Sequence, residues 1–202
     1  MKDLIAGYKR FRATGWPEQR RKFQSLARHG QSPRTLVLTC IDSRVDPAMI
    51  FDAPPGEMLT VRNVANLIPP YAPDGAYHGT SAAIEFGVKV IEVQHVVVLG
   101  HGLCGGVKAL LEGAPPTANE FVVPWMSMAE SARVQAMGAP PEGRQLRCEY
   151  EVVKVSLANL MTFPWIADRV AKGKLVLHGA WFGIHSGSLM MLQPDGLFAA
   201  PD

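Results

Sequence analysis

Cysteine is scarce in this sequence, with three residues among 202. Small secreted domains that rely on disulfides carry cysteine far more densely, so a disulfide framework is excluded as the basis of the fold. A few scattered cysteines are more typical of metal binding or catalysis in a reducing compartment. We therefore expect a cytoplasmic protein whose cysteines take part in chemistry.

Long apolar runs are also missing, because no stretch of about 18 apolar residues occurs in the chain. The first residues mix Lys2, Asp3 and Lys9 among apolar positions, which does not match a signal peptide. The chain also has no large net charge, because its 20 Lys and Arg nearly balance its 18 Asp and Glu. The sequence thus predicts no membrane span and no nucleic-acid partner, which would require a basic surface.

The composition is that of an ordinary globular domain, with 48% apolar and 19% charged residues. A chain of 202 residues is long enough for one domain with a single core and short for two full domains. We expect a single domain over residues 1–202. Within it, residues 1–30 are expected to form an N-terminal helical arm and residues 31–202 an α/β core.

Short apolar segments bounded by turn residues alternate with segments of helical periodicity. One helix is expected over 81–92, with Ala83, Phe86 and Val90 on its apolar face, and two helical pieces over 119–161. This alternation predicts an α/β fold, with a mostly parallel sheet and helices on both of its faces. The strands are expected at 35–39, 58–61, 95–99 and 175–177, followed by an apolar run at 189–192.

Two potential metal ligands lie at the ends of predicted strands. Cys40 follows the first strand, His101 follows the third, and Cys104 comes three positions later. Because the carboxyl ends of parallel strands meet at one edge of a sheet, we expect one crevice to hold all three. Thiolate and imidazole are ligands that zinc prefers, and three of them leave a tetrahedral position open for water. We therefore predict one Zn²⁺ per chain, whereas Cys148, without a His neighbour, is predicted not to bind metal.

Two charged residues follow Cys40 at steps of two. In extended backbone, the side chains of Cys40, Asp42 and Arg44 project to the same side. A carboxylate there could orient a metal-activated water, and the planar fork of an arginine is suited to holding that carboxylate ionised. We predict catalytic roles for Asp42 and Arg44.

Taken together, three motifs closely resemble the β-class carbonic anhydrases, and the resemblance extends over about residues 31–179. It implies a zinc enzyme that reversibly hydrates CO2 to bicarbonate and a proton. It also implies a homodimer or higher homo-oligomer with its sites at the subunit interface, and N-terminal helices that reach a partner subunit. The motifs are Cys40-Ile-Asp42-Ser-Arg44-Val-Asp-Pro47, Arg62-Asn-Val-Ala-Asn66 and His101-Gly-Leu-Cys104-Gly-Gly106.

The same resemblance implies four substrate-binding residues. Gln31 matches a glutamine that hydrogen-bonds substrate or anion. Leu59, Val64 and Phe86 match a small apolar pocket for CO2, in which many relatives carry Tyr in place of Phe86. Since the pocket is apolar, we expect the missing hydroxyl to have little effect on the chemistry.

One subgroup of the family holds inhibitory bicarbonate in a second pocket built from Trp, Arg and Tyr. In this chain Arg62 matches the Arg, but Val37 and Phe182 stand at the other two positions. We therefore predict that the second bicarbonate pocket is absent.

Three other interpretations remain open. The segment 100–105 satisfies the G-x-G-x-x-G pattern of a dinucleotide-binding oxidoreductase, although no acidic strand end follows at the required distance. A relative with the same metal ligands can act on CS2 or COS, so a related zinc hydrolase is a second alternative. In the third, Cys40 is a buried apolar residue and Asp42 with Arg44 is a plain ion pair.

Overall fold

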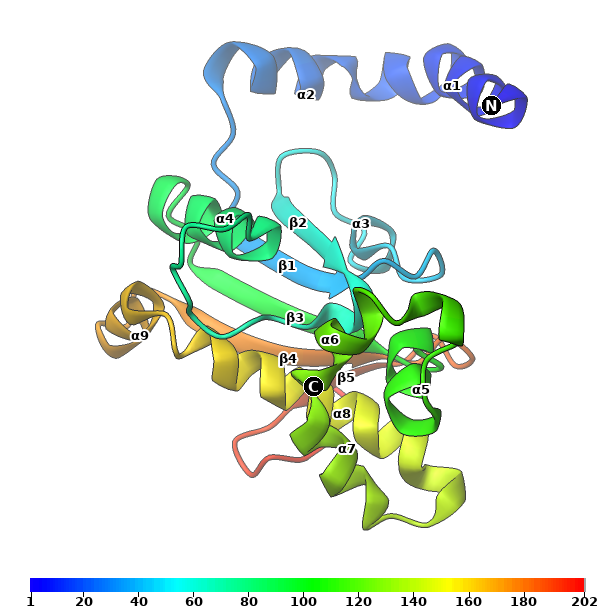
Figure 1. Ribbon diagram of the computed structural model, residues 1–202. Coiled ribbons are helices and arrows are strands. Elements are labelled where there is room, and N and C mark those ends of the chain that lie inside the picture. Colours follow the sequence, from blue (N-terminus) through cyan, green and yellow to red (C-terminus); the bar gives the residue numbers. More distant parts are fainter. Residues whose placement is uncertain (202) are drawn as a thin grey trace.

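The computed structural model describes residues 1–201 and has a six-stranded sheet at its centre (Figure 1). The strand order is β2-β1-β3-β4-β5-β6, in which the first four strands are parallel and the last two antiparallel. The predicted mostly parallel sheet flanked by helices is thus confirmed. The strands are β1 (Thr35–Cys40), β2 (Met58–Asn63), β3 (His95–His101), β4 (Val176–Phe182), β5 (Leu189–Leu192) and β6 (Phe198–Ala199).

Helices and short helical turns connect the strands. Within residues 1–201, no helix has both the length and the apolar character to cross a membrane. The helices are α1 (Lys2–Ala13), α2 (Gly15–His29), α3 (Pro47–Ile50), α4 (Gly79–Glu85), α5 (Gly105–Glu112), α6 (Val122–Ser127), α7 (Glu130–Met137), α8 (Arg144–Leu160) and α9 (Pro164–Ala171). The 3-10 turns are η1 (Val64–Asn66), η3 (Pro116–Ala118) and η4 (Pro141–Gly143), and η2 (Phe86–Val90) is a π-helical turn.

The main core lies on one face of the sheet. Successive side chains of a strand point to opposite faces, so Leu36 and Leu38 of β1 share this face. They pack with Ile84 of α4, Val153 of α8 and Ile166 of α9, all fully buried. This packing anchors the parallel strands and thereby fixes where their carboxyl ends lie.

We expect Leu38→Ala to lower the free energy of unfolding by about 2–5 kcal/mol, because truncation leaves a cavity in a core that cannot fully collapse. Leu38 is 0% exposed. Leu197→Ala is the control, since Leu197 is 61% exposed and its truncation should change stability by less than about 0.5 kcal/mol. Urea unfolding measures both. Equal destabilisation by the two substitutions would contradict this description of the core.

The opposite face of the sheet carries a smaller cluster of Val37, Leu99 and Ala180. Among the described apolar residues that pack around this cluster, only Ile50 of α3 belongs to a helix. The expectation of helices on both faces is therefore only partly met within one chain. Most of the helical cover lies on the main-core face, which leaves the second face sparsely covered.

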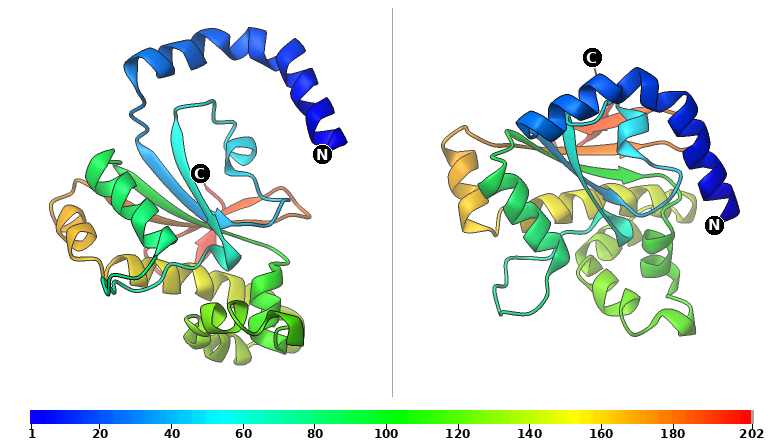
Figure 2. Two further views of the ribbon diagram at one scale, coloured as in Figure 1. Left: turned by 45° about the horizontal axis from the view of Figure 1, so that its top comes forward. Right: turned by 90° about the horizontal axis from the view of Figure 1, so that it is seen from above.

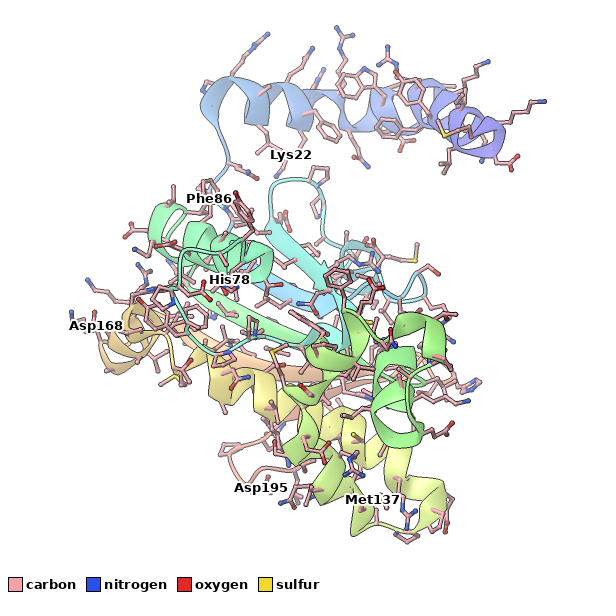
Figure 3. All side chains as sticks on the ribbon, in the orientation of Figure 1. Lys22, His78, Phe86, Met137, Asp168 and Asp195 are labelled. Carbon is pink, nitrogen blue, oxygen red and sulfur yellow. The ribbon has the colours of Figure 1, made fainter. Side chains whose placement is uncertain are left out.

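The segment 81–92 differs from the predicted helix. The α-helix ends at Glu85 and continues as the π-helical turn η2, whose wider winding rotates the later residues around the axis. Ile84, Gly87 and Val88 are buried, whereas Phe86 is 51% and Val90 62% exposed. The predicted apolar face was wrong, because the buried positions 84, 87 and 88 and the partly buried position 91 form a different face at regular helical spacing. Phe86 lies at the outer surface of this segment (Figure 3).

The N-terminal arm formed by α1 and α2 stands away from the sheet in Figure 1 and in the left view of Figure 2. None of the residues of either helix is buried. The arm nevertheless carries apolar side chains, including Leu4 at 72% and Tyr8 at 61% exposed. A surface of this kind is typical of a segment that packs against another molecule.

Candidate metal centre

The three predicted metal ligands meet at the carboxyl ends of two neighbouring strands. Cys40 is the last residue of β1 and His101 the last residue of β3, and these strands pair in parallel up to Thr39 and Leu99. Cys104 lies directly before α5. All three side chains are buried. The sequence-based expectation that one crevice holds them is met by this geometry.

The ligand atoms have the spacing of a metal site, since they all lie within 4.8 Å of one another. The sulfurs of Cys40 and Cys104 are 3.9 Å apart. A tetrahedral zinc ion with bonds of about 2.3 Å to sulfur separates two thiolates by roughly 3.8 Å, so the observed spacing fits this ion. Cys148 is buried elsewhere and does not belong to this group.

The orientation of His101 also suits a metal ligand. Its Nδ1 lies 2.8 Å from the carbonyl oxygen of Gly102, to which it can donate a proton. The buried Nε2 has no hydrogen-bond partner among residues 1–201. A buried nitrogen without a partner is costly, and a backbone carbonyl on the other ring nitrogen is the usual way to present a lone pair to a metal.

The two thiols titrate as a pair. A hydrogen bond from the Cys104 side chain lowers the pKa of Cys40, although burial opposes this shift, and the nearby His101 ring and the backbone of Asp42 and Ala65 lower it further. The same thiol–thiol bond and burial raise the pKa of Cys104. One thiol of the pair is therefore easily deprotonated, whereas the other keeps its proton. A bound divalent cation would stabilise the thiolate form of both.

Asp42 and Arg44 form a two-bonded ion pair beside this group. Arg44 donates from Nε to Oδ1 of Asp42 at 2.9 Å and from Nη2 to Oδ2 at 2.6 Å. These bonds hold the pKa of Asp42 well below its usual range, with burial as the opposing influence. The same Nη2 donates to the carbonyl of Leu103 at 3.2 Å, which links the pair to the loop between His101 and Cys104.

Arg62, the one matching residue of the second bicarbonate pocket, is hydrogen-bonded to the segment that carries the candidate ligand Cys40. Its Nε donates to the Cys40 carbonyl at 3.0 Å and its Nη2 to the Asp42 carbonyl at 2.6 Å. Val37 is buried in the small cluster on the second face. Arg62 thus bonds the backbone carbonyls of the residues before and after Ile41. The absence of the second bicarbonate pocket stays a prediction.

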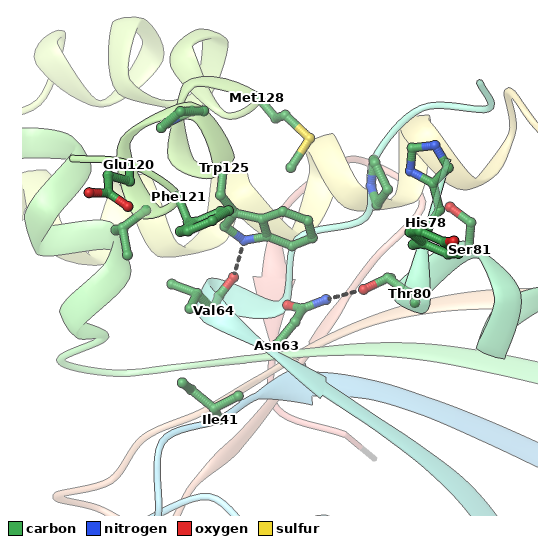
Figure 4. A pocket seen from close by; sticks show the side chains of 15 residues that line it. Ile41, Asn63, Val64, His78, Thr80, Ser81, Glu120, Phe121, Trp125 and Met128 are labelled. Atoms are coloured by element: carbon green, nitrogen blue, oxygen red, sulfur yellow. Dashed lines mark hydrogen bonds between the residues drawn. The ribbon is translucent and has the colours of Figure 1, made fainter. Parts of the chain in front are cut away.

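A cavity of about 730 Å³ lies next to the carboxyl ends of β1 and β2 (Figure 4). Its walls are mostly apolar, with Val64, Phe121 and Trp125 among them, and Trp125 donates from Nε1 to the Val64 carbonyl at 2.8 Å. Of the four predicted substrate residues, only Val64 lines this cavity.

The other three predicted substrate residues lie toward the opposite end of the sheet. Leu59 pairs with Leu36, four positions before Cys40, which corresponds to about 13 Å along the strand. Gln31 precedes β1 and is exposed. Phe86 adjoins Gly87, and Gly87 packs against Leu36, since a Cβ added at position 87 would lie 3.1 Å from the Leu36 side chain. Phe86 is thus near the same end of β1 as Leu59. The structure therefore does not bring these three residues to the metal ligands of their own chain.

Sequence reasoning missed one buried group at the site. The carboxylate of Glu149 in α8 accepts a hydrogen bond from the backbone N–H of Cys104 at 3.1 Å. Burial raises the pKa of Glu149, while bonds from Gln145, Cys104 and Trp181 oppose the rise. A signal was present, since Glu149 falls at helical spacing with the apolar residues Val153 and Leu160, which places a carboxylate on a buried helix face.

Comparison with known proteins agrees with this geometry. The family model for carbonic anhydrases matches residues 35–189. The chain is 34% identical to β carbonic anhydrase 3 of Arabidopsis thaliana over 95% of its length and 76% of that protein. It is 35% identical to a carbonic anhydrase of Pseudomonas aeruginosa over 96% of its length and 88% of that protein.

Solved structures show the same similarity. The β-carbonic anhydrase CcaA superposes with a TM-score of 0.91 at 33% identity, covering 100% of this chain and 92% of that one. A structure from a study of two tetrameric β-carbonic anhydrases of the fungus Sordaria macrospora superposes with a TM-score of 0.82 at 25% identity, covering 98% of both chains. The chain belongs to the β-carbonic anhydrase family.

Proposed function

We propose that this protein is a zinc-dependent carbonic anhydrase, which converts CO2 and water to bicarbonate and a proton and catalyses the reverse reaction. CO2 hydration is the general activity of its family. The observation that carries the proposal is the convergence of two thiols and one imidazole whose buried Nε2 has no other partner in residues 1–201. Cys40, His101 and Cys104 would hold one Zn²⁺ per chain.

The residues around this group suit the reaction. Bound zinc supplies the Lewis acidity that makes water a nucleophile near neutral pH. Asp42, held ionised by the fork of Arg44, is a hydrogen-bond acceptor that would orient this nucleophile toward CO2. An apolar wall such as that formed by Val64 suits a substrate that offers few polar atoms. Cys148 stays outside this chemistry.

The test combines metal analysis with stopped-flow measurement of CO2 hydration. Purified protein should contain about one zinc per chain and should hydrate CO2. Protein that contains zinc but acts only on CS2 or COS would support the related hydrolase instead. Protein without zinc and without activity would overturn the enzyme proposal and leave the buried thiols as structural residues.

The dinucleotide-binding alternative has little support. The fingerprint requires a helix and then a second strand that ends in an acidic residue. Here α5 has eight residues and is followed by η3 and α6, and the next strand along the chain is β4. Two residues of the same loop, His101 and Cys104, belong to the candidate metal site. NAD or NADP titration should show no binding.

We further propose that the active form is a homodimer, or a larger assembly of dimers, in which each site is shared. Gln31, Leu59 and Phe86 lie too far from the metal ligands of their own chain to serve them, so a second subunit would have to supply them. The exposed apolar residues of the arm and the sparsely covered second face of the sheet offer surface for such an interface.

Mixing two inactive variants tests this shared site. Cys104→Ala removes a metal ligand, and Gln31→Ala removes a proposed substrate contact. If Gln31 acts on the partner's site, co-expressed chains should form mixed dimers with one intact site each, and restore about a quarter of the wild-type activity. Separately tagged chains allow the mixed dimers to be isolated. Restoration near zero, with mixed dimers present, would show that the site lies within one chain.

A further inference from the structure

The loop that carries two of the metal ligands has an unfavourable backbone conformation. It runs from His101, the end of β3, to Cys104, the residue before α5. Between them Leu103 has φ +57°, the left-handed region that non-glycine residues rarely adopt. Such a conformation persists only where the surrounding structure holds it. The position of the Cys104 sulfur depends on these holding contacts.

Two side chains of α8 hold the backbone of Cys104 on both of its polar groups. The N–H of Cys104 donates to Oε1 of Glu149 at 3.1 Å. The carbonyl of Cys104 accepts from Nε2 of Gln145 at 3.1 Å, and the same Nε2 lies 2.8 Å from Oε1 of Glu149. Gln145 and Glu149 are one helical turn apart, so together they form a bracket that holds the two peptide groups flanking the Cys104 Cα.

The bracket is also tied to the sheet. Trp181 of β4 donates from Nε1 to Oε2 of Glu149 at 3.0 Å. The indole lies close to the loop because position 102 is glycine, where an added Cβ would be 3.1 Å from the ring. Both oxygens of Glu149 therefore accept N–H donors, and these come from the loop, from α8 and from β4.

A buried carboxylate is an expensive choice for this position. Glu149 is 3% exposed, and its neighbours on the helix face are the apolar Val152 and Val153. An apolar residue would fill the same space without the desolvation cost of a charge. It would, however, leave the N–H of Cys104 without an acceptor. The need for an acceptor at the Cys104 N–H, in the loop that carries two candidate ligands, therefore explains why a carboxylate occupies this position.

We propose that Glu149 is a positioning residue of the metal centre, which acts with Gln145 and Trp181 to fix the backbone of Cys104 and so the direction of its sulfur. The inference rests on the proposed function, since it presumes that Cys104 binds the metal. Loss of a contact of this kind typically lowers metal affinity by about 10- to 100-fold.

The test compares three single variants with the wild type. Glu149→Met keeps the length of the side chain and removes every acceptor, so we expect zinc affinity, measured by chelator competition, to fall by about 10- to 100-fold. Glu149→Gln can keep its carbonyl toward the Cys104 N–H, but its NH2 group would face the Trp181 N–H donor, so it should recover only part of that loss. Glu151→Met is the matched control: Glu151 is on the same helix, pairs with Arg147 and Lys154, and does not contact the loop.

A spectroscopic measurement separates positioning from general destabilisation. In the cobalt(II) form, the thiolate-to-cobalt charge-transfer band reports on the sulfur ligands and should be shifted or weakened in Glu149→Met alone. Gln145→Ala removes the other half of the bracket from a partly exposed position and should weaken zinc binding even if Glu149→Met does not fold.

Two outcomes would overturn the inference. If the wild type binds metal normally, and Glu149→Met and Gln145→Ala match Glu151→Met in affinity and in the cobalt spectrum, Glu149 does not position Cys104 and the proposed function is unaffected. If the wild type itself binds neither zinc nor cobalt, the proposed function fails and the inference falls with it.

Discussion

Cys40→Ala is expected to abolish stoichiometric zinc binding and to lower CO2 hydration by more than about a hundredfold, since losing a direct ligand should exceed the loss of an outer contact. The remaining donors, His101 and Cys104, hold an ion at only two points. Metal content by atomic emission and the stopped-flow rate measure the two effects on the same sample.

The third cysteine provides a matched control for this experiment. Cys148 is also fully buried, and burial raises the pKa of its thiol to about 12, so it stays protonated at neutral pH. Cys148→Ala should keep about one zinc per chain and lose only some stability, because a small buried side chain is shortened. If Cys148→Ala lost the metal and Cys40→Ala retained it, the assignment of the ligands would be wrong.

The second large effect is expected for Asp42→Asn, which should lower kcat/KM for CO2 hydration by about a hundredfold or more with zinc content unchanged. An asparagine has the size of the aspartate but can present only one acceptor to Arg44, and its NH2 group would oppose the Arg44 donors. The nucleophile would then lose a charged acceptor in a fixed orientation.

Asp168→Asn is the control for removing an aspartate from an ion pair. Asp168 pairs with Lys172 at 2.8 Å on the surface of α9, far along the chain from the metal ligands. Exposed pairs of this kind contribute little, so activity and stability should both be close to the wild type. Wild-type activity in Asp42→Asn would refute the catalytic role of this carboxylate.

The candidate metal site could be predicted from the sequence because each of its residues lies at or next to the end of a recognisable strand. Cys40 and His101 each end a strongly apolar β-strand, and parallel strands place their carboxyl ends at one edge. Strand ends are therefore enough to bring the ligands together in a prediction. The charged pair of Asp42 and Arg44 was predicted for the same reason, since both partners lie within four positions of Cys40.

Features that depend on packing between distant segments were not predictable in the same way. Glu149 reaches the metal-binding loop across 45 positions of sequence, and its partner Trp181 comes from a further strand. The segment 81–92 contains two possible apolar faces, and only the packing against the sheet shows that the one with Ile84 and Val88 is buried while Phe86 is exposed. The antiparallel pairing of β5 with β4 and of β6 with β5 likewise depends on the direction in which the chain turns after β4.

The substrate residues show a third kind of limit. Gln31, Leu59 and Phe86 were predicted through resemblance, and one chain places them away from its own ligands. A single sequence gives no distance between subunits, so whether these residues act on a neighbouring site depends on an interface that neither the sequence nor one chain contains. The mixed-variant experiment addresses that interface directly.

X-ray absorption at the zinc edge of the purified wild-type protein, at alkaline pH, is the most direct measurement of the central claim. We predict two sulfur neighbours at about 2.3 Å and two lighter atoms at about 2.0–2.1 Å, one of which exchanges with solvent or added anions. Four protein ligands with no exchangeable neighbour, or no sulfur bound to zinc at all, would contradict the account.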